Sequence, residues 1–323
     1  MNEAINIFML GRPGGHLAFT LDQHIIALNE DKQNRFSVKE LIEGHTTVDE
    51  LSRAHVFWFY AKAFSPSVYT QLKDLFPHAK YVFGPNILLD KPDVGANDSW
   101  DEWFINTVDF DLHLDQVEFY NNHVKKFLRS EMVCKSTHLD KCMRLSIFDE
   151  DVIEQDRSID CLVYSKKRRY DYNFEGFRNK IVAGLKSRNL NFYEITYGSY
   201  DKKDFLDLLL KSKVMLNLSL DECPGILNYE AMYCNTPVIG SPHNVPSTFD
   251  TQLWVENTDE MTEKYLVRQP EAAAVYLSKL DSFLTGEIET ELSPREFVLQ
   301  HTSYERYCDD VADLLKEHCG LWD

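Results

Sequence analysis

Two glutamates stand eight positions apart within residues 220–241, LDECPGILNYEAMYCNTPVIGS. Glu222 precedes the turn at residues 223–225, and Glu230 follows that turn inside a predicted helix. The helix begins at Gly225, Ile226 and Leu227, where backbone N–H groups lack helical partners and carry the positive end of the helix dipole. Such a helix start suits a diphosphate. We therefore predict a site in which the helix start holds an anion and the two carboxylates accept hydrogen bonds from different hydroxyls of one ligand.

Four consecutive basic residues form a second candidate site. Lys166, Lys167, Arg168 and Arg169 directly follow a predicted strand, at the end where parallel sheets bind ligands. Residues 160–213 contain 12 Lys or Arg against 7 Asp or Glu, in a chain of net charge −18. Alternate residues leaving a strand share a face, which favours Lys166 and Arg168 as anion ligands. Any two of the four could still face the ligand, and a solvated charge run is the alternative.

A glycine-rich turn follows the first apolar run. Gly14, Gly15 and His16 stand at the start of a predicted helix, and absent side chains let a phosphate or an acceptor approach the backbone. A GxGxxG motif is absent, which argues against a dinucleotide site. His16 could act on an acceptor hydroxyl or simply begin the helix. Asn86, after the Gly84-Pro85 pair, is a candidate acceptor contact, with a structural turn as the alternative.

Short apolar runs alternate with amphipathic segments, and this pattern predicts βα units and parallel sheets. The predicted strands are residues 5–10, 55–60, 80–83, 116–119, 160–164, 192–197 and 214–218. The predicted helices include residues 67–76, 122–129, 175–188 and 202–211. We therefore expect an α/β fold.

An acidic stretch at residues 148–159 has the composition of a solvated linker. We place a domain boundary there, between residues 1–152 and 153–323, which agrees with the two domains that 323 residues predict. The last helix, residues 303–318, could pack back on the first domain. Two such α/β domains would bring the carboxyl ends of both sheets to a shared cleft.

Composition narrows the class of protein. A net charge of −18 disfavours nucleic acid and anionic membranes as partners. The sequence has no apolar run of 18 residues, and its first ten residues lack the features of a signal peptide, so we expect a cytoplasmic protein. Seven scattered cysteines without a CxxC pair predict reduced thiols rather than a zinc site.

The Glu222-x7-Glu230 spacing, followed by Ala231-Met232 and by residues 235–239 (NTPVI), resembles the signature of retaining GT-B glycosyltransferases related to glycosyltransferase family 4. The resemblance implies that Glu222 contacts the donor sugar, that Glu230 holds the ribose of the nucleotide, and that backbone amides of residues 225–227 hold the phosphates. Asn235 stands where the family commonly has glycine, and asparagine also tolerates the left-handed backbone.

The same resemblance implies roles for the basic run and for the loop after residues 192–197. Lys166 and Arg168 would neutralise the departing diphosphate, with Lys167 as a further donor contact. Tyr197 or its backbone would meet the nucleobase. The expected reaction is transfer of a sugar, with retention, from a nucleotide diphosphate sugar that is UDP- or GDP-linked to a carbohydrate or glycoconjugate acceptor. No cofactor and no metal is required when basic side chains neutralise the diphosphate.

Three alternatives remain open at this point. Asp109 and Asp111, with His113 and Asp115 nearby, resemble the metal-binding Asp-x-Asp of GT-A glycosyltransferases. A nucleotide-sugar epimerase would share the GT-B architecture and the diphosphate-sugar site. A non-catalytic sugar-binding protein is the third alternative, although intact Glu222 and Glu230 argue against it.

Overall fold

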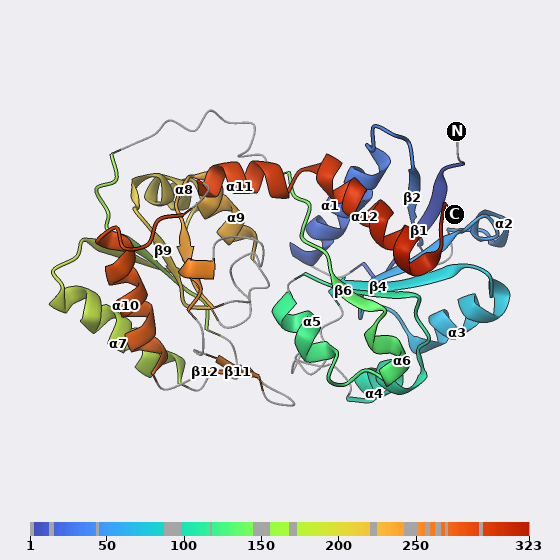
Figure 1. Ribbon diagram of the computed structural model, residues 1–323, viewed down its shortest axis with the longest axis horizontal. Coiled ribbons are helices and arrows are strands. Elements are labelled where there is room, and N and C mark those ends of the chain that lie inside the picture. The colour runs from blue at the N-terminus through green and yellow to red at the C-terminus, as the bar shows by residue number, and fades with distance from the viewer. Residues whose placement is uncertain are drawn as a thin grey trace. The chain divides into compact units, whose positions relative to one another are not determined.

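The computed structural model describes residues 3–12, 16–42, 45–86, 98–116, 118–144, 156–167, 173–219, 225–241, 251–255, 259–261, 266–268, 271–290 and 293–322. The chain forms two compact units (Figure 1). The first unit contains Met1–Arg144 and His301–Asp323, and the second contains Leu145–Gln300. The last helix therefore belongs to the first unit.

The first unit has a parallel sheet of six strands among its described residues, in the order β2-β1-β3-β4-β5-β6. The strands are β1 (Ile5–Leu10), β2 (Phe36–Glu40), β3 (Val56–Ala61), β4 (Lys80–Asn86), β5 (Leu112–Asp115) and β6 (Ser136–His138). The helices are α1 (His16–Asn29), α2 (Val48–Leu51), α3 (Pro66–Leu75), α4 (Asp98–Thr107), α5 (Glu118–Val124), α6 (Ser130–Val133) and α12 (Tyr304–Cys319).

This sheet is buried on both faces, which is why its central strands are continuous apolar runs. In β3, Trp58 and Tyr60 belong to one hydrophobic cluster, whereas Phe57 and Phe59 belong to another. Successive side chains of a strand point to opposite faces, so the two clusters are the two faces of the sheet. On the second face the rings of Phe59 and Phe83 stack with centroids 4.6 Å apart.

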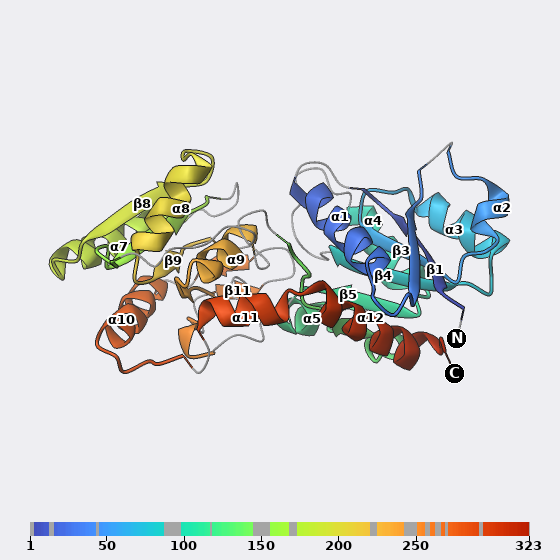
Figure 2. The same cartoon turned by 90° about the horizontal axis from the view of Figure 1, so that it is seen from above.

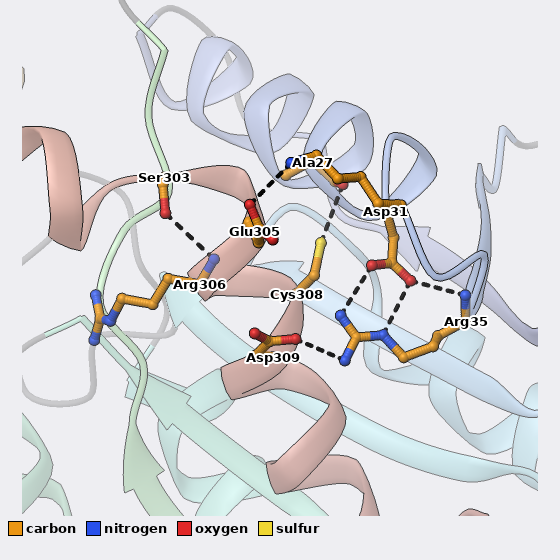
Figure 3. A network of polar contacts seen from close by, with 9 residues as sticks. Ala27, Asp31, Arg35, Ser303, Glu305, Arg306, Cys308 and Asp309 are labelled. Atoms are coloured by element: carbon orange, nitrogen blue, oxygen red, sulfur yellow. Dashed lines mark hydrogen bonds and ion pairs between the residues drawn. The ribbon is translucent and has the colours of Figure 1, made fainter.

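Helix α12 completes the first of these clusters. It runs beside α1 in both views (Figures 1 and 2). Its buried residues recur at intervals of three to four positions and form one apolar stripe: Tyr307, Cys308, Val311, Leu315 and Cys319. Figure 3 shows polar contacts along the same seam, where the Cys308 thiol donates to the carbonyl of Ala27 at 3.2 Å. Arg35 bridges Asp31 and Asp309 there, at 2.9 and 2.8 Å.

The second unit has a parallel sheet in the order β10-β9-β7-β8 and a separate antiparallel pair, β11 with β12. The strands are β7 (Cys161–Ser165), β8 (Phe192–Thr196), β9 (Met215–Asn217), β10 (Val238–Ile239), β11 (Asp259–Met261) and β12 (Leu266–Arg268). The helices are α7 (Phe174–Ser187), α8 (Lys202–Lys211), α9 (Ile226–Tyr233), α10 (Ala272–Leu284) and α11 (Pro294–His301), with a 3₁₀ turn at Thr251–Leu253.

In both parallel sheets the strand order reverses at the first strand. β1 lies between β2 and β3, and β7 lies between β8 and β9. Right-handed crossovers then place the helix that precedes the reversal and the helix that follows it on opposite faces of the sheet. Open parallel sheets bind ligands beside the carboxyl ends of the strands at such a reversal. In the second unit that position lies between the ends of β7 and β9.

Two sequence predictions are corrected. The strand predicted at residues 116–119 is wrong, because β5 ends at Asp115 and α5 begins at Glu118. Helix α5 ends at Val124 and begins four residues earlier than the helix predicted at residues 122–129. A search for continuous apolar runs could not identify β5, because two of its residues are a buried histidine and a buried aspartate, His113 and Asp115. The predicted linker also extends too far, since Ile159 is buried and its carbonyl accepts from the N–H of Lys213 at 2.9 Å.

No helix within the described ranges is long and apolar enough to cross a bilayer.

The buried stripe of α12 predicts a large loss of stability on truncation. Leu315 is 1% exposed, so Leu315→Ala should lower the free energy of unfolding of the first unit by about 2–5 kcal/mol. Denaturant unfolding of the full chain measures this loss. Leu314→Ala is the matched control, because Leu314 is only partly buried and should cost less. Equal losses for the two variants would contradict the placement of α12.

Candidate functional site

The carboxyl end of β7 presents a buried hydroxyl followed by two lysines. Ser165 is 1% exposed, and its Oγ has no hydrogen-bond partner among the described residues. Lys166 extends to the end of the neighbouring strand, with its Nζ 4.4 Å from the ring centroid of Tyr197. Lys167 pairs at 3.5 Å with Glu175, in the first turn of α7. Lys166 and Tyr197, predicted separately as diphosphate and base contacts, are therefore neighbours in the fold.

A buried amide fixes the end of β9 relative to α9. The Asn217 Nδ2 donates to Oδ1 of Asn228 at 2.9 Å, and the Asn217 Oδ1 accepts from the N–H of Ser219 at 2.9 Å. The backbone carbonyl of Asn217 accepts from the hydroxyl of Tyr276, on α10, at 2.9 Å. Asn217, Ser219 and Asn228 are fully buried. These bonds tie β9, α9 and α10 together at the carboxyl edge of the sheet.

Helix α9 starts where the sequence predicts. Gly225 is its N-cap, in an extended conformation, and cannot satisfy the first-turn N–H groups with a side chain. The first turn also contains no acidic residue, so its positive dipole end is not neutralised from within the helix. From Leu227 to Tyr233 every side chain of α9 is buried. The helix is thus held by packing while its start has the chemistry of an anion site.

The other end of α9 is fixed by an arginine. Arg157 donates to the carbonyls of Cys234 and Asn235 at 2.8 and 3.0 Å, and to the hydroxyl of Thr236 at 2.6 Å. It also donates to the carbonyl of Leu209 at the end of α8, at 3.3 Å. A cation at two helix C-termini is favourable because those ends carry partial negative charge. Asn235 has φ +56°, the left-handed conformation that asparagine was predicted to supply in place of glycine.

Glu230 is the buried carboxylate of this region. Its residue is 4% exposed, and Oε1 accepts a hydrogen bond from Nζ of Lys202, the first residue of α8. Burial raises the pKa of Glu230, because a charged carboxylate is poorly solvated inside the protein, whereas the ammonium of Lys202 acts in the opposite direction. The net pKa is above its usual value. The ion pair therefore only partly compensates the burial of the charge.

The structure describes seven of the thirteen predicted site residues with their side chains. These are Lys166, Lys167, Tyr197, Gly225, Ile226, Leu227 and Glu230, all in the second unit. His16 begins α1 and Asn86 ends β4, but the side chains of both lie outside the description. Gly14, Gly15, Arg168 and Glu222 lie outside the described residues altogether.

Four residues of this region were not predicted from the sequence. Asn217 and Asn228 are polar residues inside apolar segments, which is the signal of a buried hydrogen bond that could have identified them. Arg157 was assigned to the linker. Lys202 was counted only within the basic stretch, and nothing in its sequence position pairs it with a glutamate 28 residues later.

The polar groups beside the glycine-rich turn of the first unit are already paired. Arg12 binds Glu40 at 2.6 Å and Asp22 at 2.7 Å, so its charge is neutralised by two carboxylates. Asp109 and Asp111 precede β5 and lie at the amino edge of the sheet. Asp109 pairs with Arg129 at 2.5 Å, and Asp111 accepts from the N–H of Tyr81 at 2.9 Å. Within the described residues no group of three His, Cys, Asp or Glu side chains could hold a metal ion.

Comparison with known proteins identifies the fold. No protein-family model matches the chain, and no curated protein matches it in sequence. Sucrose-phosphate synthase from Thermosynechococcus elongatus matches in structure with a TM-score of 0.56 and 13% identity, over 98% of this chain and 99% of that chain. The lipopolysaccharide outer core galactosyltransferase WaaB matches with a TM-score of 0.57 and 10% identity, over 97% and 99%.

A structure of the GtfA/B complex matches with a TM-score of 0.51 and 12% identity. That match covers 81% of this chain and 57% of the other, so this chain spans little more than half the length of that relative. Together with the two parallel sheets, these similarities establish an α/β fold of the GT-B type. The fold expected from the sequence is thus confirmed.

We expect the hydrogen bonds of the buried Asn217 amide to make a measurable contribution to the free energy of unfolding of the second unit. Asn217→Ala removes one hydrogen bond to the N–H of Ser219 and one to Oδ1 of Asn228, and each loss should cost about 1–3 kcal/mol. Calorimetry of the full chain measures the effect on the second unit. Asn191→Ala is the control, since the Asn191 Nδ2 donates to the carbonyl of Ser158 at the surface and its loss should cost less. A cost for Asn217→Ala no greater than that of the control would contradict a structural role.

The raised pKa of Glu230 predicts the sign of a pH effect. The folded protein binds the proton of Glu230 more tightly than the unfolded chain, whose carboxyl titrates near 4.5. The resulting stabilisation is complete below that pH and is lost as pH rises through the folded pKa. In denaturant titrations, the free energy of unfolding of the native protein minus that of Glu230→Gln should therefore fall as the pH rises above about 4.5. A difference that stays constant or grows with pH would show that burial does not raise the pKa of Glu230.

Proposed function

We propose that this GT-B chain is a glycosyltransferase that transfers a sugar, with retention, from a nucleotide diphosphate sugar to an acceptor hydroxyl. The observation that carries the proposal is Glu230, a carboxylate buried in the second turn of α9, beside the carboxyl edge of a parallel sheet at its reversal point. A buried carboxylate is costly unless it has partners, and Lys202 compensates only in part. Ribose hydroxyls would supply the missing hydrogen bonds.

The diphosphate would lie between the start of α9 and the end of β7. The N–H groups of Gly225, Ile226 and Leu227 would donate to the phosphate oxygens, and Lys166 would supply positive charge from the neighbouring strand. In this arrangement the nucleobase would lie near Tyr197, whose ring the Lys166 ammonium covers on one face. Lys167, which Glu175 already holds, would contribute at longer range.

The reaction requires stabilisation of the leaving diphosphate. Lys166, Arg168 and the start of α9 would bind the developing charge more strongly than they bind the intact donor, and this difference accelerates transfer. Glu222 would hold the donor sugar while the acceptor attacks from the face that the diphosphate leaves. The first unit would bind the acceptor, with His16 and Asn86 as its proposed contacts and Gly14 and Gly15 allowing a close approach. No metal is needed when basic groups neutralise the diphosphate.

The first test is binding and transfer with UDP-, GDP-, ADP- and dTDP-sugars. At least one should raise the melting temperature, because a ligand that binds only the folded state stabilises it by about 2.7 kcal/mol at 100 times its Kd.

Glu230→Ala should weaken the binding of the free nucleotide diphosphate by about 1–3 kcal/mol, measured by calorimetry. Glu287→Ala, at an exposed position, is the control and should leave that binding unchanged.

Transfer should persist in EDTA, and NMR should show a retained anomeric linkage.

The outcomes separate the alternatives. An inverted linkage would contradict retention. A nucleotide-sugar epimer formed without acceptor would identify an epimerase. Loss of activity in EDTA and in Asp109→Ala, with recovery on Mn²⁺, would contradict metal independence and would indicate a metal site at Asp109. Failure of every nucleotide sugar to bind would overturn the proposal.

A further inference from the structure

A buried amide without a partner lies at the carboxyl edge of the first sheet. Gln116 directly follows the last residue of β5 and is 5% exposed. Its Nε2 has no hydrogen-bond partner in the part of the chain that the structure describes. Burying an amide in this way costs free energy, because the group gives up its hydrogen bonds to water and gains none in return. The fold therefore contains a buried polar group that does not help to hold it together.

The polar side chains next to Gln116 form a hydrogen-bonded network of their own. Asn121, on α5, donates from Nδ2 to Oγ of Ser136 at 2.7 Å and to the carbonyl of Thr137 at 2.9 Å. The same Nδ2 lies 3.3 Å from Oδ2 of Asp115, the last residue of β5. These bonds join α5, β5 and β6, which pack against one another (Figure 1). The strand end that carries Gln116 is thus fixed without the Gln116 amide.

The charges at this edge of the sheet disfavour an anion. The cations that follow β1 and β3 are already compensated, because Arg12 binds two carboxylates and Lys62 pairs with Asp101. Asp115, directly before Gln116, adds a carboxyl group that is fully buried. A phosphate or a carboxylate would therefore approach a carboxyl group and meet compensated cations, and like charges repel strongly where little water lies between them. The edge is better matched to uncharged groups.

A carboxamide is suited to bind an uncharged hydroxyl group. Its nitrogen carries two N–H donors and its oxygen accepts, so it can pair with a hydroxyl in either direction. A bound hydroxyl would supply the hydrogen bond that Nε2 of Gln116 lacks in the free protein. An acceptor without that hydroxyl would leave the buried amide unsatisfied, and a site of this kind discriminates against such molecules.

We propose that Gln116 binds a hydroxyl group of the acceptor, and that the acceptor is an uncharged carbohydrate rather than a phosphorylated or acidic one. Gln116 is then a specificity-determining residue, whose amide gains its hydrogen bond when the acceptor binds. This inference rests on the proposed function, in which the first unit binds the acceptor, and it names the class of acceptor.

The first test separates a binding role from a structural one in the full chain without ligand. Gln116→Met removes the amide at similar length, so the melting temperature should stay the same or rise, because no hydrogen bond is lost. Asn121→Leu is the matched control, since Asn121 is 1% exposed and its amide is bonded within the network. It should lower the melting temperature by about 4 °C or more. An equally large decrease in Gln116→Met would overturn the inference.

The second test measures transfer from the nucleotide sugar that the donor screen identifies. The acceptors are methyl glycosides of glucose, galactose, mannose and N-acetylglucosamine, with their 6-phosphates and the corresponding uronides as charged counterparts. At least one neutral glycoside should have a kcat/KM about 10-fold or more above that of its charged counterpart. Gln116→Met should lower the kcat/KM of that glycoside about 3- to 10-fold, through KM, as one lost hydrogen bond predicts. The KM of the donor and its hydrolysis by water should not change.

Gln71→Met is the control for this second test, because it removes the same amide at an exposed position of α3 and should change none of these values. An unchanged acceptor kcat/KM in Gln116→Met would overturn the inference, as would equal or better use of the charged sugars. Failure of every sugar while the donor binds would also overturn it, and would leave the donor side of the proposed function standing. If no nucleotide sugar binds, the proposed function fails and the inference fails with it.

Discussion

The hydrogen bonds of Asn217 are the constraint on which the candidate site depends. β9 has only three residues, and the helix that follows it, α9, has the proposed anion site at its start. The bond between Asn217 and Asn228 sets the register, while Tyr276 holds the same strand end from α10. With α9 fixed, Glu230 lies within reach of Lys202 at the start of α8.

Positive charge lies at the carboxyl edge of the second sheet, although the net charge of the protein is negative. The chain carries −18, but the carboxyl edge of the second sheet has Lys166, and the dipole of α9 adds a positive end. In the first unit the equivalent arginine is neutralised, because Arg12 binds both Glu40 and Asp22. The two units therefore differ in electrostatics at matching positions, although the strand order of both sheets reverses at the first strand. This difference favours the second unit as the side that holds a diphosphate.

The fold could be predicted largely from local patterns, and the site only in part. Continuous apolar runs predicted β1, β3, β4, β7 and β9 because sheets buried on both faces leave that pattern. They could not predict β5, where His113 and Asp115 are buried with hydrogen-bond partners, or the reversal of strand order, which depends on which side of β7 the chain returns to. Glu230 was predicted from its spacing to Glu222. Lys202 and Arg157 were not, because each acts across the fold on a segment distant in sequence.

The return of α12 to the first unit has a consequence for synthesis. Residues 145–300 form a complete second unit between two parts of the first, so the ribosome delivers that unit whole before the first can close its core. Until α12 emerges, the face of the sheet that contains Trp58 and Tyr60 lacks Tyr307, Val311 and Leu315. The nascent chain thus carries an exposed apolar surface through the translation of about half its length, at the rate of 5–20 residues per second typical of ribosomes, on the order of ten seconds or more. Chaperones that bind apolar surface have that interval in which to act.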